Sequence, residues 1–98
     1  MRRSPPAPQI PVHLPHRLRE LAGRQAAVLA CGATVGAVIE DLVVRHPALR
    51  PRLKDAAGKL RTWVLFFLND EDIRTRQGEE TPVGEGDVLA IVAVAEGG

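Results

Sequence analysis

A single helical stripe of apolar side chains dominates the middle of this 98-residue chain. Its members recur at the spacing of one helix face: Val35, Val38, Ile39, Leu42 and Val43. That spacing predicts an amphipathic helix with one buried side. Thr34 is the expected N-cap, because its hydroxyl can accept a hydrogen bond from a free amide of the first turn. His46-Pro47 should end the helix, since the residue before a proline is pushed out of helical geometry.

The other apolar segments have the patterns of strands, so we expect the helix to pack on one face of a sheet. Residues 10–14 and 25–30 alternate between apolar and other side chains, which predicts two strands of an antiparallel hairpin. Residues 62–68 are apolar on both faces, which indicates a strand that is covered on both sides or nearly so. Residues 88–94 form the last apolar strand.

Polar and small residues mark the connections between these elements. Cys31-Gly32-Ala33 is expected to be a turn, and residues 47–61 a basic connection with leucine anchors. Residues 69–72 are expected to form a polar turn, after which Ile73-Arg74 begins a short return strand.

The order of elements is strand, strand, helix, strand, short strand, strand. The first and last strands are expected to be parallel neighbours at the centre of the sheet, because both are apolar and a crossover joins them. The prediction is an α+β fold of the ubiquitin-like β-grasp type, with a mixed four- to five-stranded sheet and one main helix on one face. Residues 10–94 form this domain, between a loose tail at residues 1–9 and a flexible tail at residues 95–98.

Composition excludes several classes of protein. No apolar run approaches the roughly 18 residues of a transmembrane helix, so we expect no membrane association. No apolar export segment follows Arg2-Arg3, and the cytoplasm is the expected location. A lone cysteine, Cys31, cannot form an internal disulfide, and one cysteine with three histidines gives no basis for a metal site.

The charge is uneven along the chain. Residues 1–61 hold eleven Lys/Arg and four Asp/Glu, whereas residues 62–98 hold two and eight. Such asymmetry raises the possibility of a nucleic-acid partner. The basic residues are scattered and aromatic residues make up only 3% of the chain, so we expect no nucleic acid to bind.

No group of residues has the makings of a catalytic centre, so no catalytic residue is assigned. Ser4 lies in the predicted loose tail. Cys31 could act as a nucleophile with one of the histidines, but it is interpreted as a small turn residue. The carboxylates of residues 69–72 are adjacent in a turn and point apart. No bound cofactor is expected.

The remaining chemical feature is the pair Gly97-Gly98, which ends the given sequence shortly after a strand. Two glycines give a slim segment that can thread a narrow channel and adopt backbone angles closed to other residues. A free carboxylate is a poor acylating group because its negative charge repels nucleophiles. Transfer of AMP from ATP would convert it to a mixed anhydride with a good leaving group, and attack by sulfide or a persulfide would then yield a thiocarboxylate.

Several stretches of this sequence resemble the ubiquitin-like sulfur-carrier family, and most closely its cysteine-synthesis branch. They are Val12-His13-Leu14-Pro15 with Leu18-Arg19, Gly32 through Leu42, Gly58-Lys59-Leu60-Arg61, Leu68-Asn69-Asp70-Glu71-Asp72-Ile73-Arg74, Thr81-Pro82-Val83, Gly86-Asp87-Val88 and Gly97-Gly98. Together they cover about residues 10–98. The run from Asn69 to Arg74 combined with the diglycine is the most specific part of the resemblance.

The resemblance implies that Gly98 is adenylated and then carries the sulfur, while Gly97 and Glu96 enter the partner's active site with it. It implies two partners: an adenylyltransferase similar to the enzymes that activate ubiquitin, which uses ATP, and a sulfur-accepting synthase. Phe66, Phe67 and Leu68 are candidates for an apolar docking face, with the core as the competing interpretation. We expect a monomer that binds its partners through the sheet.

Two other functions remain open at this point. A ubiquitin-like modifier would use the same activated Gly98 to acylate lysines of other proteins. A non-covalent binding module would use its sheet and would not need the diglycine. The acceptor pathway is open as well: cysteine, molybdopterin, thiamine thiazole or a sulfur-containing secondary metabolite.

Overall fold

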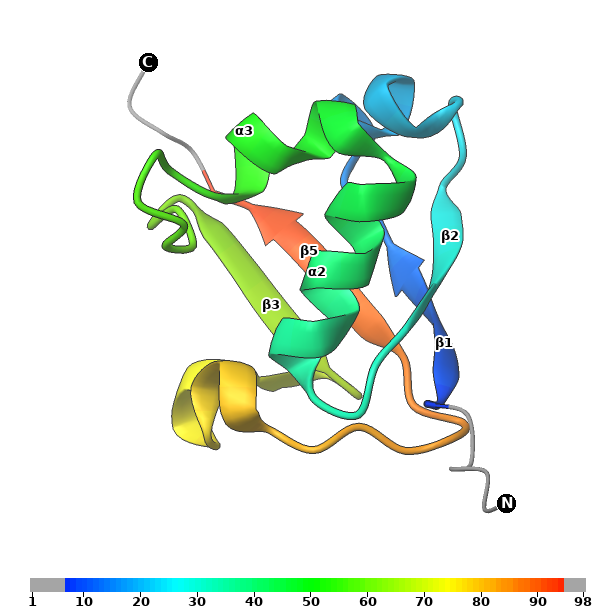
Figure 1. The fold of residues 1–98 in the computed structure, drawn as a ribbon, viewed down its shortest axis with the longest axis vertical. Helices are drawn as coiled ribbons and strands as arrows, with labels where there is room; N and C mark the ends of the chain where they lie inside the picture. The colour runs from blue at the N-terminus through cyan, green and yellow to red at the C-terminus, as the bar shows by residue number, and fades with distance from the viewer. Residues whose placement is uncertain (1–6, 95–98) are drawn as a thin grey trace, which may run out of the picture.

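The structure is a computed structural model that describes residues 7–94. One five-stranded sheet has the order β2-β1-β5-β3-β4, and its strands are β1 Gln9–His13, β2 Ala27–Cys31, β3 Val64–Leu68, β4 Glu71–Asp72 and β5 Leu89–Ala93. The main helix α2, Val35–Arg45, packs on one face, while the one-turn helices α1, His16–Arg19, and α3, Arg50–Leu53, lie at the upper end in Figure 1. This arrangement is a β-grasp and confirms the predicted fold class.

The predicted centre of the sheet is confirmed. β5 runs parallel to β1, with Val12 opposite Leu89 and His13 opposite Ala90. β5 runs antiparallel to β3 along all five residues, from Val64 opposite Ala93 to Leu68 opposite Leu89. β5 therefore has a paired strand on each side, and its direction decides where the chain leaves the sheet.

Helix α2 forms as the apolar stripe predicts. The Thr34 hydroxyl accepts a hydrogen bond from the Ala37 amide at 3.1 Å, and all five members of the stripe are buried. They pack against the inward side chains of the sheet, which include Ile10, Val12, Phe66, Leu89 and Ile91. The sequence pattern and the core therefore agree position by position.

Four sequence predictions are corrected by the structure. Gln9 already belongs to β1, so the ordered strand begins before Ile10. Cys31 is the last residue of β2 rather than part of a turn. The segment predicted as a plain connection holds a 3₁₀ turn, Pro47–Leu49, and α3, because each proline occupies the first turn, where it needs no amide partner.

The fourth correction concerns the return strand. Asn69 and Asp70 have positive φ values of 52° and 69°, as a two-residue hairpin turn requires, so pairing resumes at once and β4 is Glu71–Asp72. Ile73-Arg74, predicted as the strand, instead starts a 3₁₀ turn, Ile73–Thr75, and Ile73 is buried.

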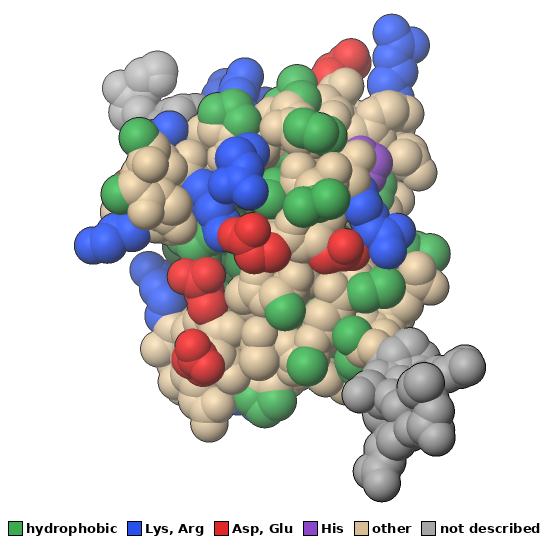
Figure 2. Space-filling view, in the orientation of Figure 1, with side chains coloured by type: hydrophobic (Ala, Val, Ile, Leu, Met, Phe, Trp, Pro, Cys, Tyr) green, Lys and Arg blue, Asp and Glu red, His purple; other side chains and the backbone are tan. Residues whose placement is uncertain are grey.

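Charged side chains lie on the outer side of α2 and over α3, as Figure 2 shows. The Lys54 side chain is only 7% exposed and is paired with Glu40. Glu40 also lies 3.6 Å from Arg50. Asp41 accepts hydrogen bonds from the Cys31 amide at 2.8 Å and from Arg45 at 2.7 Å. Since Cys31 lies at the end of the edge strand β2, Asp41 ties α2 to that edge.

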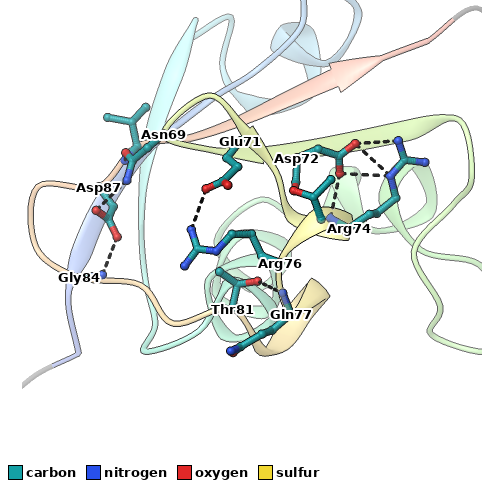
Figure 3. Close-up of polar contacts among 11 residues, drawn as sticks. Asn69, Glu71, Asp72, Arg74, Arg76, Gln77, Thr81, Gly84 and Asp87 are labelled. Atoms are coloured by element: carbon teal, nitrogen blue, oxygen red, sulfur yellow. Dashed lines mark hydrogen bonds and ion pairs between the residues drawn. The ribbon is translucent and has the colours of Figure 1, made fainter.

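A polar clamp holds the end of the sheet where β5 begins (Figure 3). The Asn69 side-chain amide donates to Asp87 at 2.9 Å, and the Asn69 side-chain oxygen accepts from the Val88 amide at 2.9 Å. Asp87 also accepts from the Gly84 amide at 2.7 Å. The clamp therefore joins the β3–β4 turn to the loop that leads into β5 and helps to fix the register between β3 and β5.

The other side-chain hydrogen bonds at this end of the sheet join residues between Glu71 and Thr81. Asp72 accepts hydrogen bonds from the Arg74 guanidinium at 2.7 and 3.0 Å, and Arg76 donates to Glu71 at 3.1 Å. These contacts to Arg74 hold the pKa of the Asp72 carboxyl below its usual value. Thr81 is fully buried, and its hydroxyl accepts from the Gln77 amide.

The first prediction tests the core beneath α2. Ile39→Val should lower the free energy of unfolding by about 0.5–1.5 kcal/mol, because it removes one buried methylene. Ile39→Asp should prevent folding, because it places an unpaired charge in the core. The matched control is Val44→Ala on the same helix, where Val44 is 69% exposed and little should change. Chemical denaturation followed by circular dichroism measures all three.

The second prediction tests the clamp. The hydrogen bonds from Asn69 and from the Gly84 amide lower the pKa of Asp87, so the folded state favours its carboxylate. This stabilisation is present above the usual aspartate pKa of about 4 and is lost as the pH falls through the lowered folded value. Asn69→Ala should raise the pKa of Asp87 and reduce stability at neutral pH.

Asn69→Gly also removes the side-chain hydrogen bonds, but it adds no backbone strain, because glycine adopts a positive φ at no cost. Its comparison with Asn69→Ala therefore separates the loss of the hydrogen bonds from the cost of the positive φ. We expect both variants to lose less stability than the parent protein between about pH 5 and pH 2, and Asn69→Ala to be the less stable of the two. NMR titration measures the pKa of the Asp87 carboxyl, and chemical denaturation at each pH measures the free energy of unfolding. An unchanged Asp87 titration in both variants would contradict the clamp.

Candidate functional site

The described chain leaves the sheet at the end of its central strand. The last hydrogen bond of this segment joins the Val94 amide to the Trp63 carbonyl at 2.9 Å. Val94 is 37% exposed and stands three residues before Gly97. Glu96, Gly97 and Gly98, the predicted reactive segment, lie outside the described residues, so the structure locates their attachment point and not the residues themselves. We call the end of the sheet around Val94 the tail-exit end.

Arginines lie on the segments that follow β1 and precede β3, the two neighbours of β5. Arg19 donates from Nε to the Leu14 carbonyl at 3.0 Å, and Leu14 directly follows β1. Arg61 donates from Nε to the Pro51 carbonyl at 2.7 Å, and its own carbonyl accepts from the Val64 amide, where β3 begins. Both guanidinium groups are therefore held at the tail-exit end by neutral carbonyl oxygens.

One carboxylate, Asp55, lies in the same region. It accepts hydrogen bonds from the Lys59 amide at 3.0 Å and from the Ala57 amide at 2.9 Å. These amides, together with the positive charges of Arg61 and Lys59, lower the pKa of Asp55. Asp55 therefore remains ionised at neutral pH and shapes the loop that precedes β3.

The sheet face opposite α2 carries a run of apolar side chains. Phe67 is half-buried there, while Leu29 is 50% exposed and Val92 is 40% exposed. We call these three residues, with Pro11, Leu65 and Ala90, the open sheet face. They occupy the strand positions that alternate with the core residues.

The structure places two of the three candidate docking residues in the core, which was the competing interpretation. Phe66 is 3% exposed and Leu68 is 1% exposed, so both belong to the core beneath α2. Only Phe67 lies on the open sheet face, because successive residues of a strand point to opposite sides. Leu29 and Val92 were not predicted as members of an exposed face, although their alternation with buried neighbours along β2 and β5 is the pattern of an exposed strand position.

Residues 7–94 contain no cluster of three His, Cys, Asp or Glu side chains suited to a metal ion. The Cys31 thiol accepts a hydrogen bond from the Arg45 guanidinium at 3.5 Å. Cys31 and His13 lie at opposite ends of the β1–β2 ladder, about 13 Å apart by strand geometry. The 250 Å³ pocket beside β3 is lined by two arginines, a threonine and five apolar side chains, which is not a nucleophile–base arrangement.

The segment with the most specific family resemblance lies away from the tail-exit end. Asn69 and Asp72 adjoin the last residue of β3, whereas Val94 adjoins its first, a distance of about 13 Å along the strand. This segment is therefore structural. It sets the β3–β4 turn and the register of β5, and it does not contact the end of β5 from which the tail leaves. No helix among the described residues has the length and hydrophobicity needed to cross a bilayer.

Comparisons with known proteins agree with this geometry. The chain is 38% identical over 91 residues to sulfur carrier protein CysO of Mycobacterium tuberculosis, covering 91% of this chain and 98% of that protein. A chain of the Amycolatopsis orientalis BexX/CysO complex superposes with a TM-score of 0.81 at 37% identity, covering 91% of this chain and 99% of its own.

Small archaeal modifier protein 1 of Methanosarcina acetivorans has a TM-score of 0.86 at 26% identity, covering 94% of this chain and 98% of its own. The sequence profile of the ThiS family matches residues 12–98, which takes in the β-grasp described above and continues through Gly98. The chain therefore belongs to the ThiS family.

Proposed function

We propose that this protein is a sulfur carrier, a substrate of other enzymes rather than a catalyst, and that the carbonyl carbon of Gly98 is its reactive atom. The observation that carries the proposal is the match to the ThiS family through residue 98, on a sheet whose central strand leads directly into the diglycine segment. The relatives of this chain that are named sulfur carrier proteins support it. The protein acts in the cytoplasm, where ATP is available, and as a monomer.

The chemistry requires two steps on Gly98. Its carboxylate attacks the α-phosphorus of ATP, pyrophosphate leaves, and an acyl adenylate forms. Hydrosulfide then attacks the acyl carbon, AMP leaves with the bonding electron pair, and loss of a proton gives the thiocarboxylate. An adenylyltransferase supplies the ATP site, and the carrier itself binds no cofactor.

The acceptor is a synthase that presents an electrophilic carbon to the thiocarboxylate sulfur. A slim diglycine segment suits this delivery, because it has no side chain to obstruct a narrow active-site channel. The complex of BexX with CysO gives a precedent for a partner protein among the relatives. Similarity to CysO favours the cysteine-synthesis branch over acceptors for molybdopterin or thiazole.

The open sheet face gives these partners a surface to hold. Phe67, Ala90 and Val92 lie on β3 and β5, the strands that end or begin beside Val94. A partner that covers these side chains removes apolar area from water and can receive the tail at the same time. One surface then serves both the activating enzyme and the acceptor.

The third prediction tests the reactive group. Incubation with ATP, sulfide and the adenylyltransferase of the same organism should raise the intact mass by about 16 Da, because sulfur replaces one oxygen. Deletion of Gly98 should abolish the gain and leave the unfolding curve unchanged, because the residue lies beyond the last sheet hydrogen bond at Val94.

A variant shortened by one residue at the other end of the chain, without Met1, is the matched control and should gain the same mass. An unchanged mass of the parent protein, with an adenylyltransferase shown to be active on another carrier, would count against the proposal. A mass gain in the Gly98 deletion would show that a different group is modified.

A second candidate is a protein modifier, which the structural similarity to small archaeal modifier protein 1 favours. The same acyl adenylate would then be attacked by a lysine amine of another protein. The chain has only two lysines, Lys54 and Lys59. Lys54 is buried and paired with Glu40, whereas Lys59 is exposed, so self-modification has one accessible acceptor.

The fourth prediction separates the two candidates. Purification from cells under denaturing conditions should yield the carrier without lysine-linked adducts on other proteins. Adducts that require Gly98 would instead support the modifier. Any adduct between copies should map to Lys59, disappear in Lys59→Arg and persist in the matched variant Lys54→Arg, which peptide mass mapping can establish.

A further inference from the structure

The uneven charge along the sequence becomes a separation of charge in the folded domain. Among the described residues, positions 7–61 hold nine Lys/Arg and four Asp/Glu, while positions 62–94 hold two Lys/Arg and seven Asp/Glu. The first group has a net charge of +5 and the second −5, so the described domain is neutral as a whole. The question is where the two sets lie in space.

The cations gather at the tail-exit end. α1, the last turn of α2, α3 and the loop before β3 all lie at the upper end of the molecule in Figure 1, where β5 finishes. These segments and the turn that follows α1 carry Arg17, Arg19, Arg24, Arg50, Arg52, Lys54, Lys59 and Arg61, whereas the Arg45 guanidinium reaches back to the Cys31 thiol, beside the start of β1. Glu20 and Asp55 are the carboxylates of the same region, and Glu20 pairs with Arg24. Glu40 and Asp41 lie earlier on α2, where Glu40 pairs with Lys54 and Arg50 and Asp41 pairs with Arg45.

The anions gather at the opposite end. They follow β3 or precede β5: Asp70, Glu71, Asp72, Glu79, Glu80, Glu85 and Asp87. Arg76 is the cation there and is paired with Glu71, whereas Arg74, paired with Asp72, lies further along β3 and lines the same pocket as Arg61. The domain is therefore an electric dipole whose positive end coincides with the point from which the tail leaves.

Two arginines of the positive end are fixed in place without being neutralised by their hydrogen-bond partners. Arg19 and Arg61 lie beside the two neighbours of β5, and each donates from Nε to a main-chain carbonyl. Holding a guanidinium with a neutral carbonyl orients it without placing a carboxylate in that hydrogen bond, although Asp55 also lies near Arg61 and has its pKa lowered by the Lys59 amide and by this guanidinium. A long side chain that is already held loses less conformational entropy when a partner binds it.

We propose that the tail-exit end docks on an acidic protein surface around the channel that receives the tail, and that Arg19 and Arg61 are the pre-oriented contacts of this docking. The proposal rests on the sulfur-carrier function and specifies the chemistry of the partner surface. Opposite charges steer association and raise its rate, and the negative far end disfavours encounters in the wrong orientation. The open sheet face then supplies the apolar contact.

The test compares two double variants of equal net charge. Arg19→Gln/Arg61→Gln removes the two pre-oriented cations, and Arg45→Gln/Arg76→Gln removes two cations whose guanidinium groups lie away from the tail-exit end, on Cys31 and Glu71. Association with the organism's own adenylyltransferase is measured by stopped-flow at about 50 and about 300 mM NaCl, concentrations between which surface charges become strongly screened. Circular dichroism confirms that both variants are folded.

The first double variant should associate about three- to tenfold more slowly at low salt, and the difference should shrink at high salt. The second should associate as fast as the parent protein or faster, because its dipole is larger. An unchanged rate in the first variant, or an equal loss in both, would overturn the proposal. Tighter binding of a single-stranded RNA 20-mer than of the adenylyltransferase, lost in the first variant, would overturn it too, because it would make the basic end a nucleic-acid site.

Failure of this inference is distinguishable from failure of the sulfur-carrier function. At saturating adenylyltransferase, every variant should still gain the mass of the thiocarboxylate, since Gly98 is intact. A full mass gain with unchanged rates would remove the docking proposal alone. No mass gain in the parent protein would remove the sulfur-carrier function and the docking proposal with it.

Discussion

The placement of β5 between a parallel and an antiparallel neighbour is the constraint on which the rest of the molecule depends. Pairing with β1 and β3 fixes the direction of β5, and its direction fixes the point where the chain leaves the sheet. The same pairing sends Leu89 and Ile91 into the core beneath α2 and Val92 to the open sheet face. The core, the open sheet face and the exit of the tail are thus consequences of one set of main-chain hydrogen bonds.

This dependence explains why the segment that is most specific to the family lies far from the tail-exit end. A slip of one residue between β3 and β5 would turn every β5 side chain to the opposite face and displace Val94 along the sheet. The contacts of Asn69 with Asp87 and with Val88 connect the two strands across the end where β5 begins. A clamp at the start of a strand thereby controls the position of its finish, about 13 Å away.

Periodicity was sufficient for α2 and for the central strands, because burial of one face leaves a repeating signal from Val35 to Val43. It failed where backbone geometry decides the structure. The hairpin turn at Asn69-Asp70 draws Glu71 into a strand, which leaves Ile73 to enter the core from a 3₁₀ turn. It also could not assign Phe66 and Phe67 to different faces, since both are apolar and only the register distinguishes them. The excess of cations in residues 1–61 was visible, but the location of the positive end was not, because its members come from separate segments that the fold brings together.

A protein that is a shared substrate needs partners that bind quickly and also release it. A large apolar interface would give tight binding and slow dissociation, and the exposed apolar side chains of the open sheet face, such as Leu29 and Val92, are few. Charge complementarity supplies a fast encounter with less cost to dissociation, because it acts over distances of about a Debye length and is weakened by salt. A positive end around the exit of the tail would therefore suit transfer between two enzymes: each would need only an acidic rim and a channel, and the diglycine would reach both active sites from the same orientation.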